Sequence, residues 1–300
     1  MPIRGEAQPG AYPLPCPAMG ASDTYDTTGP TRGLNRQLEG KTALVFGVAN
    51  RHSLAWGIAE ALHEQGARVG IVYRRPERAD KTARIARAID AAFVGQCDVS
   101  DDDAIARVMA EAATAMGPRL DVLVHSIARA EATDLGARFV DTSRAGFRSA
   151  LETSAYSLVA LAHHAHEAGL LQRGSSILTL TAIGSTRVIP GYNVMGVAKA
   201  ALEAAVRYLA VDLGPEGIRV NAISAGAVRT AAAMGVPGFR AMYHEGERFA
   251  PLRAAVTRRE VGNLAAFLAS DASALISGQV LQLDAGWSIL AMTGGDVPKA

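Results

Sequence analysis

The segment from Thr42 to Gly57, which reads TALVFGVANRHSLAWG, decides the fold class. Its first five residues form a short apolar run, typical of a strand covered on both faces of a parallel sheet. Gly47 ends the run, and a helical pattern from Ile58 to Gln65 follows. Such a glycine lets the backbone approach a pyrophosphate, while the helix N-terminus supplies N–H donors. The segment predicts a phosphate-binding turn, with a plain strand–helix turn as the alternative because Ser53 replaces the usual second glycine.

The rest of the chain repeats the alternation of apolar runs and amphipathic helical patterns. The clearest helical pattern spans Asp101 to Met116. This alternation predicts an α/β fold, a Rossmann-like doubly wound parallel sheet in a single domain over residues 39–295. Residues 1–38, rich in Pro, Gly, Ser and Thr, are expected to form a flexible tail, or else to pack against a neighbouring subunit. The further strands are expected at Arg68–Tyr73, Ala92–Asp98, Leu120–Ser126, Ser176–Thr181, Ile218–Ser224 and Val280–Asp284.

Composition narrows the function classes. The formal net charge is +1 with both signs mixed along the chain, which argues against a nucleic-acid partner. Cys16 and Cys97 are too few for a disulfide framework or a zinc site, and no metal is expected. No apolar run is long enough for a membrane span, and residues 1–20 lack the apolar region of a secretory signal. A cytoplasmic protein is the expectation.

Two arginines bear on the choice of cofactor. Arg74 and Arg75 follow the second predicted strand, where NAD-binding folds carry an acidic residue for the ribose. Guanidinium groups suit a 2′-phosphate, so NADPH is predicted in preference to NADH. A solvated basic loop is the alternative.

Tyr192 and Lys199 form a candidate catalytic pair. They are seven residues apart, close to two turns of a helix expected after Pro190-Gly191, so both would project on nearly the same side. A tyrosine can protonate a developing oxyanion, and a nearby ammonium can lower its pKa and hold a cofactor ribose.

The chain as a whole resembles the short-chain dehydrogenase/reductase superfamily, and within it the divergent enoyl-acyl-carrier-protein reductases of bacterial fatty-acid synthesis. The resemblance covers about Leu38 to Met292. In this branch the tyrosine and lysine are separated by six residues, whereas ordinary superfamily members separate them by three. The motifs are Gly47-x5-Ser53-x-Ala55-x-Gly57, Cys97-Asp98-Val99, His125-Ser126-Ile127, Pro190-x-Tyr192-Asn193-Val194-Met195-x-x-Ala198-Lys199, and Arg219-Val220-Asn221-Ala222-Ile223-Ser224-Ala225-Gly226.

The resemblance implies seven parallel strands in the order 3-2-1-4-5-6-7, a homotetramer, and a substrate lid at about 230–249. It implies hydride transfer to the β-carbon of a trans-2-enoyl thioester on acyl carrier protein or coenzyme A, with Tyr192 meeting the enolate oxygen and Lys199 holding the ribose. The expected cofactor contacts are Gly47, Ser53, Leu54, Arg74, Arg75, Asp98, Val99, Ser126, Ile127, Ala128, Lys199, Val228 and Thr230. The expected substrate contacts are Ala182, Tyr192, Met195, Ala232 and Phe239.

Two positions depart from the family pattern. Ala182 stands ten residues before Tyr192, where the family usually has an aromatic residue, and Arg240 is alone in a lid turn that usually carries several cations. These departures suggest a changed acyl substrate and weaker docking of an acidic carrier, unless the missing ring is dispensable. The alternatives are reduction of a specialised ketone or activated alkene in secondary metabolism, and a non-catalytic NADP(H)-sensing protein. Retention of both Tyr192 and Lys199 argues against the sensor.

Overall fold

The computed structural model describes residues 36–291, and these contain one seven-stranded sheet in which every pairing is parallel. The strand order is β3-β2-β1-β4-β5-β6-β7, as the family resemblance implied. The predicted Rossmann-like α/β fold is confirmed. The strands are β1 Thr42–Phe46, β2 Arg68–Tyr73, β3 Phe93–Gln96, β4 Val122–His125, β5 Ser176–Thr181, β6 Arg219–Ala225 and β7 Val280–Leu283.

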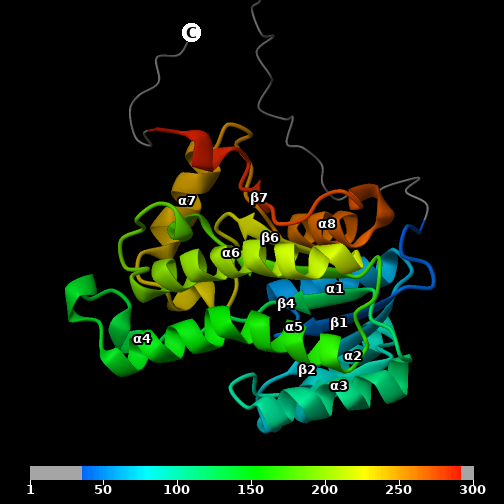
Figure 1. The fold of residues 1–300 in the computed structure, drawn as a ribbon. Coiled ribbons are helices and arrows are strands. Elements are labelled where there is room, and N and C mark those ends of the chain that lie inside the picture. The colour runs from blue at the N-terminus through cyan, green and yellow to red at the C-terminus, as the bar shows by residue number, and fades with distance from the viewer. Residues whose placement is uncertain (1–35, 292–300) are drawn as a thin grey trace, which may run out of the picture. The chain divides into compact units, whose positions relative to one another are not determined.

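Helices cover both faces of the sheet, because the central strands are apolar on both sides. Ala43 and Val45 pack with α1, α2 and α8, whereas Leu44 and Phe46 pack with α3, α5 and α6. Figure 1 shows α5 and α6 in front of the sheet. The helices are α1 Leu54–Glu64, α2 Ala79–Ala86, α3 Asp102–Met116, α4 Arg144–Leu151, α5 Ser157–Glu167, α6 Val194–Leu213, α7 Phe239–Phe249 and α8 Arg258–Ala269.

Helix α1 begins at Leu54, four residues earlier than the pattern from Ile58 predicted. The reason is Ser53, whose hydroxyl accepts a hydrogen bond from the backbone N–H of Trp56 at 3.3 Å and caps the helix. Ser53, which stands where the usual pattern has a second glycine, therefore places the N-terminus of α1 directly after the turn that follows β1.

Most of the predicted tail over residues 1–38 lies outside the described residues. Leu38, at the end of that range, is fully buried, and its N–H donates to the carbonyl of Gln65 at 3.0 Å. None of the helices within residues 36–291 has the length and apolar character of a membrane span.

Candidate functional site

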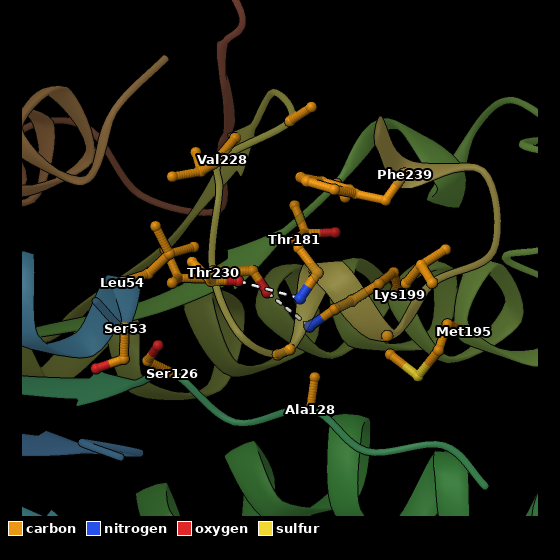
Figure 2. Close-up of a pocket in the computed structure, with 18 of the residues that line it drawn as sticks. Ser53, Leu54, Ser126, Ala128, Thr181, Met195, Lys199, Val228, Thr230 and Phe239 are labelled. Atoms are coloured by element: carbon orange, nitrogen blue, oxygen red, sulfur yellow. Dashed lines mark hydrogen bonds between the residues drawn. The ribbon is translucent and has the colours of Figure 1, made fainter. Parts of the chain in front are cut away.

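A cavity of about 690 Å³ lies at the carboxyl ends of the central strands, the usual place for a ligand in a doubly wound sheet. Gly47 after β1, Ser126 after β4 and Thr181 at the end of β5 line it. In Figure 2, Ser53, Leu54 and Ser126 lie on one side of Lys199, while Met195 and Phe239 lie on the other. Residues expected at the cofactor and residues expected at the substrate therefore line one cavity, with Lys199 between the two groups that Figure 2 labels.

Sixteen of the eighteen different predicted site residues line this cavity, and Arg75 and Asp98 do not. Arg75 is exposed and precedes a short helical turn at Pro76–Arg78. The carboxylate of Asp98 accepts from Arg74 Nε at 2.9 Å and from Ser100 Oγ at 2.8 Å. Burial raises the pKa of Asp98, but the hydrogen bonds from Arg74 and Ser100 outweigh it, so its net pKa lies below the usual value.

Tyr192 lies in the turn before α6 rather than in the helix, so the argument from helical spacing was wrong. Asn193, with φ +42° and ψ −120°, separates Tyr192 from the helix that carries Lys199, because this backbone conformation cannot continue an α-helix. The ring of Tyr192 packs directly on Gly184, where an added Cβ would lie 2.5 Å from its Cδ1. Burial raises the pKa of Tyr192 to about 12, the opposite of the expected lowering. Tyr192 is therefore a hydrogen-bond donor at neutral pH.

The side chain of Asn193 holds this turn to the loop after β4. Its Nδ2 donates to the carbonyl of Ala137 at 2.8 Å and to that of Asp134 at 3.3 Å. The same two loops are joined by the N–H of Gly136, which donates to the carbonyl of Gly191 at 3.3 Å. Pro237, just before α7, packs on both glycines: an added Cβ would lie 2.7 Å from its Cγ at Gly136 and 3.3 Å from its carbonyl oxygen at Gly191.

Replacing Asn193 separates the anchoring hydrogen bonds from the backbone strain. Asn193→Asp keeps the shape but loses both donors and places a carboxylate against two carbonyl oxygens, so it should lower the free energy of unfolding by about 2 kcal/mol. Asn193→Gly loses the same donors but adopts a positive φ without strain, so its loss should be smaller. Urea denaturation of both variants measures the difference. Equal losses would contradict the role given to the strained backbone.

Lys199 is buried on α6, with 5% of its surface exposed. Its Nζ donates to the carbonyl of Leu180 at 2.8 Å, the one acceptor recorded for it within residues 36–291. Two of its three N–H donors remain for a ligand in the cavity. Burial lowers the pKa of Lys199 to about 8, and the negative charge of Glu203 opposes that shift.

Three residues in or around this site were not among the predicted site residues: Asn193, which the sequence offered only as part of a motif, and the hydrogen-bonded pair Thr181 and Glu203. Thr181 Oγ1 donates to Glu203 Oε1 at 2.7 Å, and both side chains are buried. The signal for Glu203 was present, since it lies four residues after Lys199 and beside the apolar Leu202 on the same helix. Among the described residues, no three His, Cys, Asp or Glu side chains form a group that could hold a metal ion.

Comparison with known proteins identifies the family. Residues 47–288 match the family model described as Enoyl-(Acyl carrier protein) reductase. The chain belongs to this family. It is 49% identical over 258 residues to an enoyl-acyl-carrier-protein reductase (NADH) of Nostoc sp., covering 85% of this chain and 99% of that protein. The corresponding Escherichia coli enzyme is 46% identical over 256 residues, covering 85% of this chain and 97% of its own.

Solved structures of family members have the same fold. The crystal structure of the Bacillus cereus enoyl-acyl carrier protein reductase with NADP+ and indole naphthyridinone aligns with a TM-score of 0.82. It is 44% identical, and the alignment covers 85% of this chain and 99% of that one.

The prediction of NADPH as the cofactor is wrong. The enoyl-acyl-carrier-protein reductases of Nostoc, Escherichia coli and Synechocystis are named as NADH enzymes, and so is one from Bacillus cereus. The geometry explains the error: the Arg74 guanidinium is paired with the Asp98 carboxylate, and Arg75 does not line the cavity. A paired guanidinium is a poor anchor for a 2′-phosphate, because its charge is already compensated.

Proposed function

We propose that this chain is an NADH-dependent enoyl-acyl-carrier-protein reductase. The observation that carries the proposal is the placement of Tyr192 and Lys199 on one cavity, beside the turn between β1 and α1. Family membership over residues 47–288 supports the same reaction. When bound, NADH supplies the hydride that reduces the β-carbon of a trans-2-enoyl thioester.

The residues around the cavity fit a dinucleotide. Helix α1 begins at Leu54, and this residue and its N-cap Ser53 line the cavity together with Gly47, which suits a pyrophosphate. Lys199, buried and with two N–H donors remaining, suits ribose hydroxyls. Gly47, Ser53, Leu54, Val99, Ser126, Ile127, Ala128, Val228 and Thr230 are proposed as further contacts because they line the same cavity.

Tyr192 is proposed to act on the acyl substrate rather than on the cofactor. Its hydroxyl is proposed to donate a hydrogen bond to the thioester oxygen, where negative charge develops as the double bond is reduced. The pKa of about 12 keeps the proton on Tyr192 until that charge forms. Met195, Ala232 and Phe239 line the substrate side of the cavity, and residues 230–249 with α7 are proposed to form the lid.

The acyl group is proposed to arrive on acyl carrier protein rather than on coenzyme A. Arg229 and Arg240 line a second hollow of about 340 Å³ at the proposed lid, and their positive charges suit an acidic carrier. A homotetramer in the cytoplasm is proposed as the working form. Tyr208 and Val211 on α6 are exposed, which suits burial in a subunit interface.

The test is oxidation of NADH at 340 nm with a trans-2-enoyl thioester carried by acyl carrier protein, and NADPH run beside it. Loss of NADH matched mole for mole by saturated acyl product is the expected result. Crotonyl-coenzyme A, tested in parallel, distinguishes the carrier requirement from the reaction itself. Binding of NADH without oxidation in the presence of any enoyl thioester would overturn the proposal.

Ala182 carries a separate prediction about the acyl chain. It lines the cavity with Tyr192 and leaves space where a larger side chain would stand. Ala182→Tyr is expected to improve turnover of octenoyl thioester relative to the unmodified enzyme, because the added ring restores contacts beside the thioester. The measurement is kcat/KM for crotonyl and octenoyl thioesters with both enzymes. Fast turnover of both by the unmodified enzyme would contradict a changed acyl preference.

A further inference from the structure

Glu203 is a buried carboxylate on α6, one helical turn after Lys199, with 7% of its surface exposed. Burying a carboxylate is costly unless hydrogen bonds and an opposite charge compensate it. Its recorded hydrogen bond within the described part of the chain comes from Thr181 Oγ1, at 2.7 Å. A neutral hydroxyl alone does not balance the charge. Lys199 can supply the compensating positive charge, because it lies four residues before Glu203 on α6 and residues four apart on a helix are neighbours.

The two side chains are tied to consecutive residues of one strand. Lys199 Nζ donates to the carbonyl of Leu180, and Glu203 Oε1 accepts from the hydroxyl of Thr181. Leu180 and Thr181 are the last two residues of β5 and line the cavity. Helix α6 is thus joined to the cavity end of β5 at two successive points, one cationic and one anionic.

The other groups around Lys199 are uncharged. From β4, His125 hydrogen-bonds to Thr179 and Ser157, and burial together with the charge of Lys199 lowers the pKa of His125 to about 3. Tyr192, from the turn before α6, keeps its proton at neutral pH. From β5 come the non-titrating Leu180 and Thr181. Within residues 36–291, Glu203 is the one group whose negative charge acts on the pKa of Lys199.

We propose that Glu203 is a positioning residue of this reductase: its buried carboxylate, fixed by Thr181, keeps the Lys199 side chain protonated and directed into the cavity. The inference rests on the proposed function, in which Lys199 holds the cofactor ribose as a cation. Glu203 touches neither cofactor nor substrate in this role and acts through Lys199.

Glu203→Gln tests the charge, because glutamine keeps the volume and an oxygen that can accept from Thr181. Loss of a neighbouring charge typically moves a pKa by about one unit, here from about 8 toward 7 for Lys199. The kcat/KM for NADH, which reports the free enzyme, should then fall about eightfold at pH 8.5 and less than about twofold at pH 6.5. A purely structural defect would lower activity by the same factor at both pH values.

Matched variants isolate the effect. Asp212→Asn removes a carboxylate from the exposed end of the same helix and should leave the pH profile unchanged. Glu203→Asp retains the charge and should restore the alkaline limb of the profile, even where its overall activity is lower. If Glu203→Gln does not fold, Glu203→Met provides a neutral variant of similar length that needs no hydrogen bond from Thr181.

Binding of NADH, followed by its fluorescence from pH 6 to 9.5, gives a readout that needs no turnover. The neutral variants should bind NADH as the unmodified protein does at pH 6.5 and about eightfold more weakly at pH 8.5. This binding measurement also distinguishes failure of the Glu203 proposal from failure of the proposed function, because it gives an answer even where no enoyl thioester is reduced. A folded neutral variant with an unshifted alkaline limb in both measurements, or the same shift in Asp212→Asn, would overturn the inference.

Discussion

Tyr192→Phe should lower kcat by a factor of about 100 to 1,000 and leave NADH binding almost unchanged. The substitution removes one hydroxyl from a buried ring that packs on Gly184, so the fold and the cavity should persist. What is lost is the donor to the oxygen on which charge develops, and removal of one such donor typically costs this much in rate. Rate assays of enoyl thioester reduction give kcat, and a titration followed by NADH fluorescence gives the dissociation constant of NADH.

Tyr156→Phe is the matched control for that experiment. Tyr156 ends the helical turn Glu152–Tyr156 with 55% of its surface exposed and does not line the cavity, so losing its hydroxyl should change neither kcat nor NADH binding. Turnover by Tyr192→Phe within threefold of the unmodified enzyme would show that another group donates to the thioester oxygen. Loss of NADH binding in Tyr192→Phe would instead show that the hydroxyl holds the cofactor.

Gly47→Ala should destabilise the protein by about 3 kcal/mol and weaken NADH binding at least about tenfold. Two effects combine at this position. The backbone has φ +96°, which L side chains rarely adopt, and an added Cβ would lie 2.0 Å from the carbonyl oxygen of Ser126. Relief of that overlap must separate the turn after β1 from the loop after β4, and both line the cavity.

Gly117→Ala isolates the second effect. Gly117 ends α3 with φ +100°, but no atom lies within 4 Å of where its Cβ would be. It should therefore lose only about 1 kcal/mol, from backbone strain alone, with NADH binding unchanged. Chemical denaturation and NADH titration of both variants decide the matter. Equal losses in the two variants would contradict the close approach of Gly47 to Ser126.

The strands were predictable because each carries a strong and local signal. Thr42–Phe46, Arg68–Tyr73 and Ser176–Thr181 have the predicted bounds, since apolar runs buried on both faces leave little choice of position. The start of α1 was misplaced because a capping serine was interpreted only as a missing glycine. A side chain that accepts from the helix N-terminus sets the boundary more firmly than hydrophobic periodicity does.

The sequence predicted most of the residues that line the cavity, but not the ion pairing and backbone strain around them. Arg74 is at the predicted place, yet the pairing with Asp98 depends on the alignment of β2 with β3, which spacing along the chain does not reveal. Tyr192 likewise lines the expected cavity, but Asn193 interrupts the helix that the spacing assumed. Charge compensation and backbone strain arise from contacts between distant segments, and these depend on the whole fold.

The contact of Pro237 with Gly136 and Gly191 has a consequence for the timing of the reaction. Gly191 immediately precedes Tyr192, so the segment leading into α7 packs on the turn that carries the proposed hydrogen-bond donor. If this segment moves as the proposed lid, an opening that admits the acyl chain past Pro237 would also loosen that turn. Entry of substrate and alignment of the Tyr192 hydroxyl would then be coupled, and we expect the site to be complete only with the proposed lid closed.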